Sequence, residues 1–339
     1  MLTVTATDAA GNLSPEASYT VTGTLPNLPD VPIITAINDD ETPVTGDVKD
    51  KTTNDITPTL VGTAEAGSII TIYQDGIAVP LINVIADADG NWSYTPLIAL
   101  GEGLHTFEVT ATVGLSTSGR SPVATVTVDL TAPDTPTIGS VIDDVGPGTG
   151  QLTNGQTTND NQPTLTGSGT VGDTISVYSN GTLLGTALVG NTGTWVFTPP
   201  ALAEGNNVLT IRETDPAGNE SGLSTGFTIV VDTVSTTPAI TNVTDNVGNA
   251  ATTIVSGDPT NDATPTFGDG GSEQRGENFR RRYQIAVVTA DGTGAWTFTL
   301  TPRSAEGPHA FTVTATDPQG NVSQCHNGWN VDGLTWTAP

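Results

Sequence analysis

The sequence predicts an all-β protein made of tandem immunoglobulin-like β-sandwich domains that form an elongated rod. The first observation is internal repetition, since Trp92, Trp195 and Trp296 recur at intervals of about 100 residues, the size of one such sandwich. The second is a polar–apolar alternation in short runs, which is typical of strands with one buried face. No segment has the sustained helical period and end signals of an α-helix.

Composition agrees with thin β-cores. Hydrophobic residues make up 35% of the chain and aromatic residues 5%, while threonine, glycine and proline are abundant. The single cysteine, Cys325, excludes an intrachain disulfide. No apolar run approaches the roughly 18 residues of a membrane span, so we expect no membrane insertion. Residues 1–8 lack the features of a signal peptide and begin within a β-pattern, so we expect a piece of a longer protein.

Short proline-bearing linkers divide the chain, and proline stiffens such linkers. We predict the C-terminal strands of a truncated preceding repeat and then three Ig-like repeats, at residues 1–24, 25–131, 132–234 and 235–339.

Repeat 2 illustrates the expected strands. They cover residues 137–142, 162–167, 174–178, 183–188, 193–198, 207–213 and 226–231. A long acidic loop separates the first two strands, and the Asn180-Gly181 pair predicts a tight hairpin turn. We expect the repeated tryptophan to fill the core between the two sheets.

The chain is strongly acidic, with a formal charge of −27 from 36 acidic and 9 basic residues. Such a surface repels nucleic acid and anionic membranes, so neither is expected as a partner.

One set of acidic residues is expected at the junctions between repeats. A Thr-Asp-Pro-x-Gly-Asn loop should face the linker that enters its own repeat, which places one aspartate from each segment at each junction. The predicted junction residues are Asp129 with Asp215, and Asp232 with Asp317. Repeat 1 has Leu25 and Val113 at these two positions, and the joint loss favours a cation shared by both aspartates.

A second set lies in the acidic loop after the first strand of each repeat. It comprises Asp39, Asp40, Asn54 and Asp55, then Asp143, Asp144, Asn159 and Asp160, then Asp245 and Asp262. Neighbouring carboxylates repel one another unless a positive charge lies between them, and few basic residues are available. Calcium takes six to eight such oxygen ligands, whereas three histidines and one cysteine do not suit zinc. The alternative is that these acids only solvate a long loop.

Three sequence strings resemble a known family. They are Thr-Ala-Thr-Asp-Ala-Ala-Gly-Asn, Thr-Asn-Asp-x-x-Pro-Thr-Leu and Val-Asp-Leu-Thr-Ala-Pro. They resemble the bacterial Ig-like repeats of giant type I-secreted adhesins and biofilm-associated proteins, and the resemblance covers almost the whole chain. It implies an extracellular rod at the bacterial surface and calcium held by the aspartates of both sets. It also implies attachment, through the parent protein, to a host-cell surface or biofilm matrix component.

The sequence gives no sign of an enzyme. His105 and His309 share one repeat position where repeat 2 has Asn207, and the carboxylate pairs recur in every repeat, which suits architecture better than a unique active site. Two functions remain open. In the first, the chain is a calcium-stiffened, monomeric spacer. In the second, the repeats themselves bind a surface carbohydrate or protein receptor.

Repeat 3 departs from the repeat pattern at residues 268–288 and 325–337. Five of the nine basic residues lie between positions 275 and 303. Compensating reading-frame slips in the source sequence would explain these stretches. The alternative is a specialised basic loop that binds an acidic partner.

Overall fold

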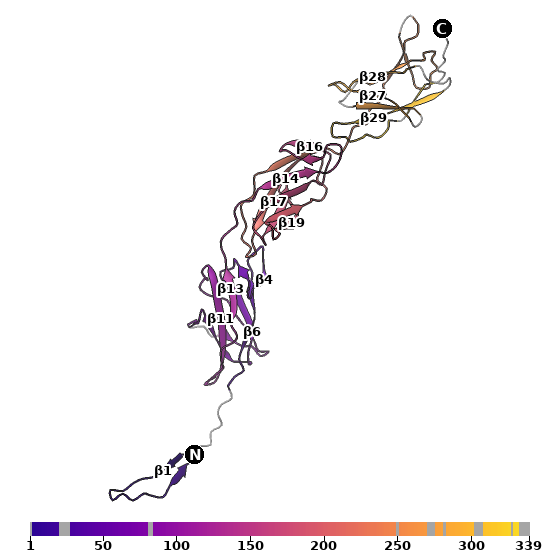
Figure 1. Ribbon diagram of the computed structural model, residues 1–339. Helices are drawn as coiled ribbons and strands as arrows, with labels where there is room; N and C mark the ends of the chain where they lie inside the picture. Colours follow the sequence, from indigo (N-terminus) through magenta and orange to yellow (C-terminus); the bar gives the residue numbers. More distant parts are fainter. Residues whose placement is uncertain are drawn as a thin grey trace. The chain divides into compact units, whose positions relative to one another are not determined.

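The computed structural model confirms the all-β class. It describes the chain except for residues 1, 20–27, 81–83, 249–250, 270–274, 281–282, 302–307, 327 and 332–339. The described residues form strands β1 to β30 and no helix (Figure 1). Accordingly, no helix able to cross a membrane occurs among them.

The chain divides into two compact units. The first contains residues 1–131 and 216–219, and the second contains residues 132–215 and 220–339. In the first unit, β1 (Leu2–Val4) and β2 (Ala17–Tyr19) pair as an antiparallel hairpin, and the preceding repeat stays a prediction.

Repeat 1 is a sandwich of two sheets. One sheet has the order β10-β6-β3-β4 and the other has the order β5-β13-β11-β7-β8. In the second sheet, β12 also pairs with β11 and β9 also pairs with β7. The strands are β3 (Ile33–Asp39), β4 (Gly46–Asp47), β5 (Thr52–Thr53), β6 (Thr59–Thr63), β7 (Ile69–Gln74), β8 (Ile77–Ala78), β9 (Val84–Ile85), β10 (Asn91–Tyr94), β11 (Gly103–Val113), β12 (Ser116–Thr117) and β13 (Ala124–Val128).

Repeat 2 repeats this topology, with sheets β15-β14-β17-β20 and β16-β22-β21-β18-β19. The strands are β14 (Ile138–Asp143), β15 (Gly150–Gln151), β16 (Gln156–Thr158), β17 (Thr164–Ser168), β18 (Thr174–Ser179), β19 (Thr182–Leu188), β20 (Thr194–Phe197), β21 (Gly205–Thr214) and β22 (Phe227–Val231). The seven predicted strands are confirmed to within three residues at their ends. Asn180 and Gly181 both adopt positive φ, as the predicted turn requires.

The acidic loop of repeat 2 is more ordered than predicted. It contains β15 and β16, and β16 pairs in parallel with the last strand, β22. The chain therefore starts in one sheet with β14 and crosses to the other sheet with β16. This crossing places the end of β16 beside the end of β22, where the linker to repeat 3 begins.

Repeat 3 has sheets β24-β23-β25-β28 and β27-β26-β29-β30. Its strands are β23 (Asn242–Asp245), β24 (Thr252–Ile254), β25 (Thr266–Asp269), β26 (Arg275–Arg280), β27 (Tyr283–Thr289), β28 (Trp296–Thr299), β29 (His309–Thr316) and β30 (Trp329–Val331). The β26–β29 pair corresponds to β18–β21 of repeat 2. Parts of both aberrant stretches lie outside the described residues, so frame slips and a basic loop both stay hypotheses.

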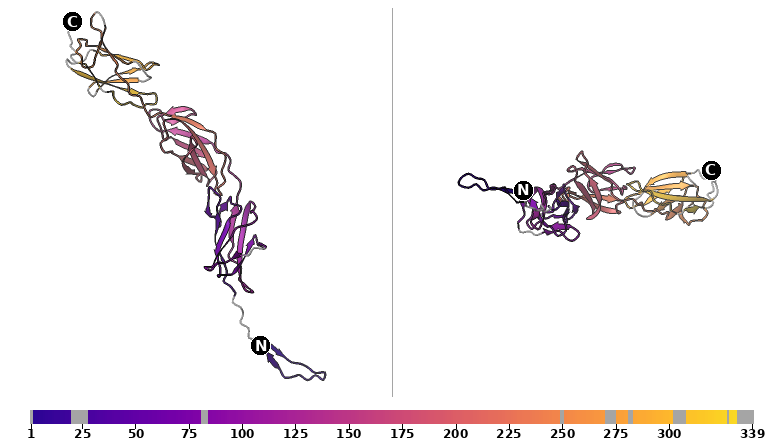
Figure 2. Two further views of the ribbon diagram at one scale, coloured as in Figure 1. Left: turned by 180° about the vertical axis from the view of Figure 1, so that it is seen from behind. Right: turned by 90° about the horizontal axis from the view of Figure 1, so that it is seen from below.

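Each repeat has its own apolar core between its two sheets. Figure 2 shows the strands of the repeats from two further directions. Trp92, Trp195 and Trp296 are at most 4% exposed, which confirms their predicted place. In repeats 1 and 2 a glycine of the neighbouring strand lies against the indole. A Cβ at Gly167 would come within 2.6 Å of the Trp195 ring, and one at Gly62 within 2.4 Å of the Trp92 ring.

We predict that Gly167→Ala destabilises repeat 2 by about 1–3 kcal/mol, because the added methyl group forces the buried indole to move. Hydrogen exchange of the β18 and β21 amides in the whole chain measures the loss repeat by repeat. Gly148→Ala is the matched control, since a Cβ there meets no atom within 4 Å. Equal exchange in the two variants would contradict the packing role of Gly167.

Candidate cation and junction sites

The acidic loop of repeat 2 is closed by a buried Asp–Thr–Asp clamp. Thr158 Oγ1 donates to Asp143 Oδ2 at 2.6 Å and accepts from the backbone N–H of Asp160 at 2.9 Å. All three residues are at most 3% exposed. Because Asp143 ends β14 and Thr158 ends β16, the clamp fastens one sheet of the sandwich to the other.

Repeats 1 and 3 contain the same clamp. In repeat 1, Thr53 Oγ1 donates to Asp39 Oδ2 at 2.5 Å and accepts from the Asp55 N–H at 3.0 Å. In repeat 3, Thr260 Oγ1 donates to Asp245 Oδ2 at 2.7 Å and accepts from the Asp262 N–H at 3.0 Å. The structure therefore brings together two predicted aspartates of each loop around a threonine. In contrast, Asp40 and Asp144 are exposed.

The surroundings of the repeat 2 clamp disfavour the charged form of its second aspartate, Asp160. Burial raises the pKa of Asp160, and the nearby charges of Asp143 and Asp144 raise that pKa further, against hydrogen bonds from the backbone N–H groups of Gln162 and Asp144. A proton or a cation would relieve this repulsion.

The clamp of repeat 1 contains acceptor oxygens without donors. Asp55 is 2% exposed, and neither its Oδ2 nor the buried Oδ1 of Asn54 has a hydrogen-bond partner within the described structure. At the equivalent position in repeat 2, Asp160 Oδ2 accepts from the Asp144 N–H at 3.3 Å, and in repeat 3 Asp262 Oδ2 accepts from the Asn246 N–H at 2.9 Å. Repeat 1 therefore offers the oxygens that best fit a hard cation.

The described residues provide at most part of a calcium shell from side chains. No group of three or more His, Cys, Asp or Glu side chains is arranged to hold a metal ion in the part of the chain that the structure describes. Calcium at a clamp would therefore need backbone carbonyls and water beside its two aspartates.

The junction that lies within the second unit is held by Asn321. Its Nδ2 donates to the backbone oxygen of Asp232 at 2.7 Å and to Asp317 Oδ2 at 2.8 Å. Asp317 Oδ1 accepts from the backbone N–H groups of Gln319 and Asn321, so the carboxylate shapes its own loop. The side-chain amide of Asn321 thus connects the predicted pair. It binds the carboxylate of Asp317 and the backbone carbonyl of Asp232.

This asparagine clasp is continuous with the clamp of repeat 2. The N–H of Asp232 donates to the backbone oxygen of Thr158 at 2.8 Å. Hydrogen bonds therefore run from Asp143 through Thr158, Asp232 and Asn321 to Asp317. They join the start of one repeat to the loop of the next.

The first unit contains the matching contacts. The Asp129 N–H donates to the Thr53 oxygen at 2.9 Å, and Asn219 Nδ2 donates to the Asp129 oxygen at 2.9 Å. Asp215 belongs to the second unit, so its predicted pairing with Asp129 stays a prediction. The prediction from charge did not include Asn219 and Asn321. Both are the last residue of the repeated Thr-Asp-Pro-x-Gly-Asn loop, so the repeat itself indicates them.

Repeat 1 departs from this loop as its sequence predicts. Val113 pairs with Ser116 across a two-residue turn, and the side chain of Leu115 in that turn is fully exposed. No aspartate or asparagine occurs in this turn. The other position, Leu25, lies outside the described residues.

We predict that Asn321→Ala loosens the junction between repeats 2 and 3 without unfolding either repeat. The variant loses hydrogen bonds worth about 0.5–1.5 kcal/mol each. Distances between spin labels on the two repeats should broaden, and amide exchange at residues 233–235 should accelerate. Asn191→Ala, at an exposed turn, is the control. An unchanged distance distribution in Asn321→Ala would contradict the clasp.

His105 forms a separate polar contact in repeat 1. Its Nδ1 lies 2.9 Å from Asp75 Oδ2 and its Nε2 lies 2.8 Å from the Gly101 oxygen. Both partners are acceptors, so only the doubly protonated ring donates to both. Burial lowers the pKa of His105, but these hydrogen bonds outweigh it and leave the pKa raised. At the equivalent position, Asn207 Nδ2 donates to the Ala203 oxygen at 2.8 Å.

We predict that His105→Asn makes the stability of repeat 1 less dependent on pH. A raised histidine pKa gives stability that is complete below the unfolded value of about 6.5 and is lost as pH rises through the folded pKa. Thermal unfolding across this interval measures the effect. His309→Asn in repeat 3 tests whether the effect is specific to repeat 1. If His105→Asn kept the pH dependence of the parent chain, a stabilising imidazolium at His105 would be excluded.

Comparison with known families identifies the class of these repeats. The family model of the bacterial Ig-like domain matches residues 30–130, 135–233 and 238–332. These matches cover most of the chain, which therefore belongs to the bacterial Ig-like domain family. They fall inside the three predicted repeats, whose boundaries stay predictions.

Several solved structures are similar to the chain. One is a tetra-tandem repeat in the extending region of a large adhesion protein, at 18% identity and a TM-score of 0.24, with coverage of 84% of this chain and 73% of that one. Another is the BSP domain of a biofilm-associated protein, at 15% identity and a TM-score of 0.21, with coverage of 94% and 69%. None of the curated proteins compared with the chain matches it.

Proposed function

We propose that this chain is a structural stalk segment of a large bacterial surface or secreted adhesin. Membership of the bacterial Ig-like family and the tandem arrangement of its domains support this function. The observation that carries it is the asparagine clasp, in which the loop of one repeat donates to Asp232, at the start of the short linker from the preceding repeat. A clasp of this kind restricts the bending of successive repeats and suits a monomeric spacer that projects a distant tip.

The proposal places the chain outside the cell and gives it no catalytic activity. Its partners would be a host-cell surface or biofilm matrix component reached through the parent protein. The carboxylates that could resemble catalytic pairs accept hydrogen bonds in the clamps of all three repeats, which is an architectural use.

Calcium is proposed at the clamps, with the first clamp as the strongest candidate. Asp39, Asn54 and Asp55 would hold the ion there, because two of their oxygens are buried without donors. The ion would neutralise the paired carboxylates and fasten the crossing between sheets. At the junction in the second unit, the amide of Asn321 already donates to Asp317 Oδ2, one of the carboxylate oxygens that the predicted ion would take, so the ion and this clasp compete for it.

A calcium titration of the whole chain tests this proposal. Extracellular calcium modules bind at about 10⁻⁴–10⁻³ M, and a hundredfold excess of ligand over its dissociation constant adds about 2.7 kcal/mol. We expect calcium to raise the melting temperature and to slow amide exchange in the repeat 1 loop. Solution scattering should show a stiffer chain than with chelator.

Asp55→Asn should abolish the calcium response of repeat 1, because it removes the charge at the unpartnered oxygen. Asp89→Asn, at an exposed loop position, should retain the response. Magnesium at equal concentration controls for charge screening. Identical exchange and scattering with calcium and with chelator would refute calcium stiffening, and the hydrogen-bonded stalk would remain.

A further inference from the structure

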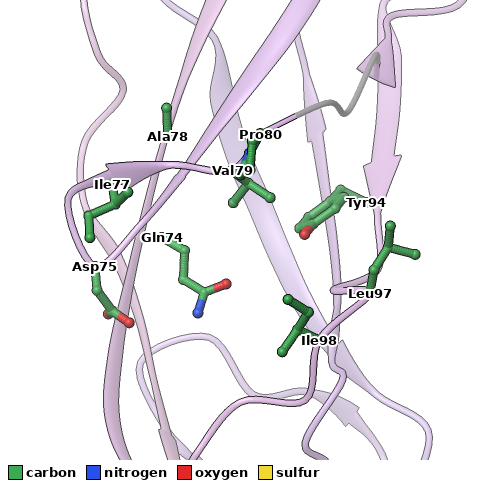
Figure 3. A pocket seen from close by; sticks show the side chains of 9 residues that line it. All are labelled: Gln74, Asp75, Ile77, Ala78, Val79, Pro80, Tyr94, Leu97 and Ile98. Atoms are coloured by element: carbon green, nitrogen blue, oxygen red, sulfur yellow. The ribbon is translucent and has the colours of Figure 1, made fainter.

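Repeat 1 has an apolar groove at the side of its second sheet. The cavity has a volume of about 370 Å³. Figure 3 shows Asp75 and Ile77 on one wall, Tyr94, Leu97 and Ile98 on the other, and the Gln74 amide between them. Among the described residues, Ala78, Val79 and Pro80 also line the groove. The groove lies within one repeat, apart from both the clamps and the junctions.

The groove exposes large apolar side chains. Ile77 is 74% exposed, Leu97 84% and Ile98 82%. Single exposed aliphatic residues are ordinary on protein surfaces, but three around one concavity are typical of an interaction site. They do not serve the core of repeat 1, whose loop is anchored by the buried Leu100.

Repeat 2 lacks these side chains at the corresponding positions. Thr182 follows its hairpin turn where repeat 1 has Ile77. The loop after its strand β20 contains Pro200 and Ala201 before the buried Leu202, whereas repeat 1 has one more residue and two large aliphatic ones. The sandwich of repeat 2 therefore folds without the three exposed aliphatic side chains that surround the groove of repeat 1.

Charge indicates which partner fits. Asp75 lies at the rim of the groove, but its Oδ2 lies 2.9 Å from His105 Nδ1 and its Oδ1 accepts from the Thr106 N–H, so its charge is already balanced locally. The wider negative field comes from the chain, whose net charge is −27. This field attracts cationic segments and repels acidic ones. A second copy of the chain would bring the same net negative charge, which disfavours self-association. Tyr94 is 6% exposed, so its ring is not available as a platform for stacking a sugar.

We propose that this groove binds an extended segment of a partner protein in which large apolar side chains are flanked by lysine or arginine. The apolar side chains would contact Ile77, Leu97 and Ile98, and the flanking cations would be attracted by the net negative charge of the chain. The Gln74 amide supplies a polar contact for the backbone of the segment. Repeat 1 would then add a binding function to the proposed stalk.

The peptide Ac-Lys-Leu-Phe-Leu-Lys-NH₂ is a suitable probe, with binding to the whole chain followed by fluorescence anisotropy of a labelled form. The double variant Leu97→Ser with Ile98→Ser should weaken binding at least tenfold. Both side chains are more than 80% exposed, so folding should not change. Leu188→Ser, 68% exposed on repeat 2, is the matched control and should bind as the parent does.

Two further measurements distinguish the alternatives. The peptide Ac-Glu-Leu-Phe-Leu-Glu-NH₂ should bind at least tenfold more weakly at low ionic strength, and added salt should reduce this difference. Equal binding of the two peptides would overturn the proposed charge preference. Equal binding by the double variant and the parent would overturn the groove, as would self-association abolished by the double variant. Neither result depends on calcium or on the stalk function.

Discussion

The architecture depends on a buried threonine hydroxyl that binds two aspartates in each repeat. In repeat 2, Thr158 donates to Asp143 and accepts from the N–H of Asp160, which fixes the point where the chain crosses from one sheet to the other. The carbonyl of the same threonine accepts the N–H of Asp232 at the start of the linker. A group that closes the sandwich therefore also positions the oxygen that Asn321 binds. Because these bonds share residues, a disturbance of the clamp should reach the junction.

Sequence reasoning predicted the fold because its evidence was distributed along the whole chain. Repetition of Trp92, Trp195 and Trp296 and strand alternation are properties of many residues at once. Short elements carry no such pattern. The three residues of β16 are Gln156 to Thr158, without apolar alternation, and their strand character comes from pairing with β22 far along the chain. Tertiary contact decides such a strand, so local sequence does not indicate it.

The candidate sites were predicted in part for a similar reason. Formal charge directed attention to aspartates, and Asp39, Asp55, Asp143 and Asp160 do lie buried in pairs. The neutral partners were overlooked. Two kinds of neutral residue hold these aspartates: a threonine that donates to a carboxylate, and an asparagine that bridges Asp232 and Asp317. Neither changes the net charge, although both recur with the repeat. Recurrence at a fixed repeat position is a better guide to function here than charge.

The three clamps are alike in hydrogen bonding but not in the need for a cation. In repeats 2 and 3 a backbone N–H reaches the second aspartate, whereas the corresponding oxygen of Asp55 is buried without a donor. An unsatisfied buried acceptor costs about 1–3 kcal/mol, and a charged one costs more. A bound ion would offset the cost of the unsatisfied acceptor only where no backbone N–H donates to that oxygen. The calcium proposed for the clamps would therefore contribute most to repeat 1, the repeat whose loop lacks the asparagine clasp and whose surface has the apolar groove.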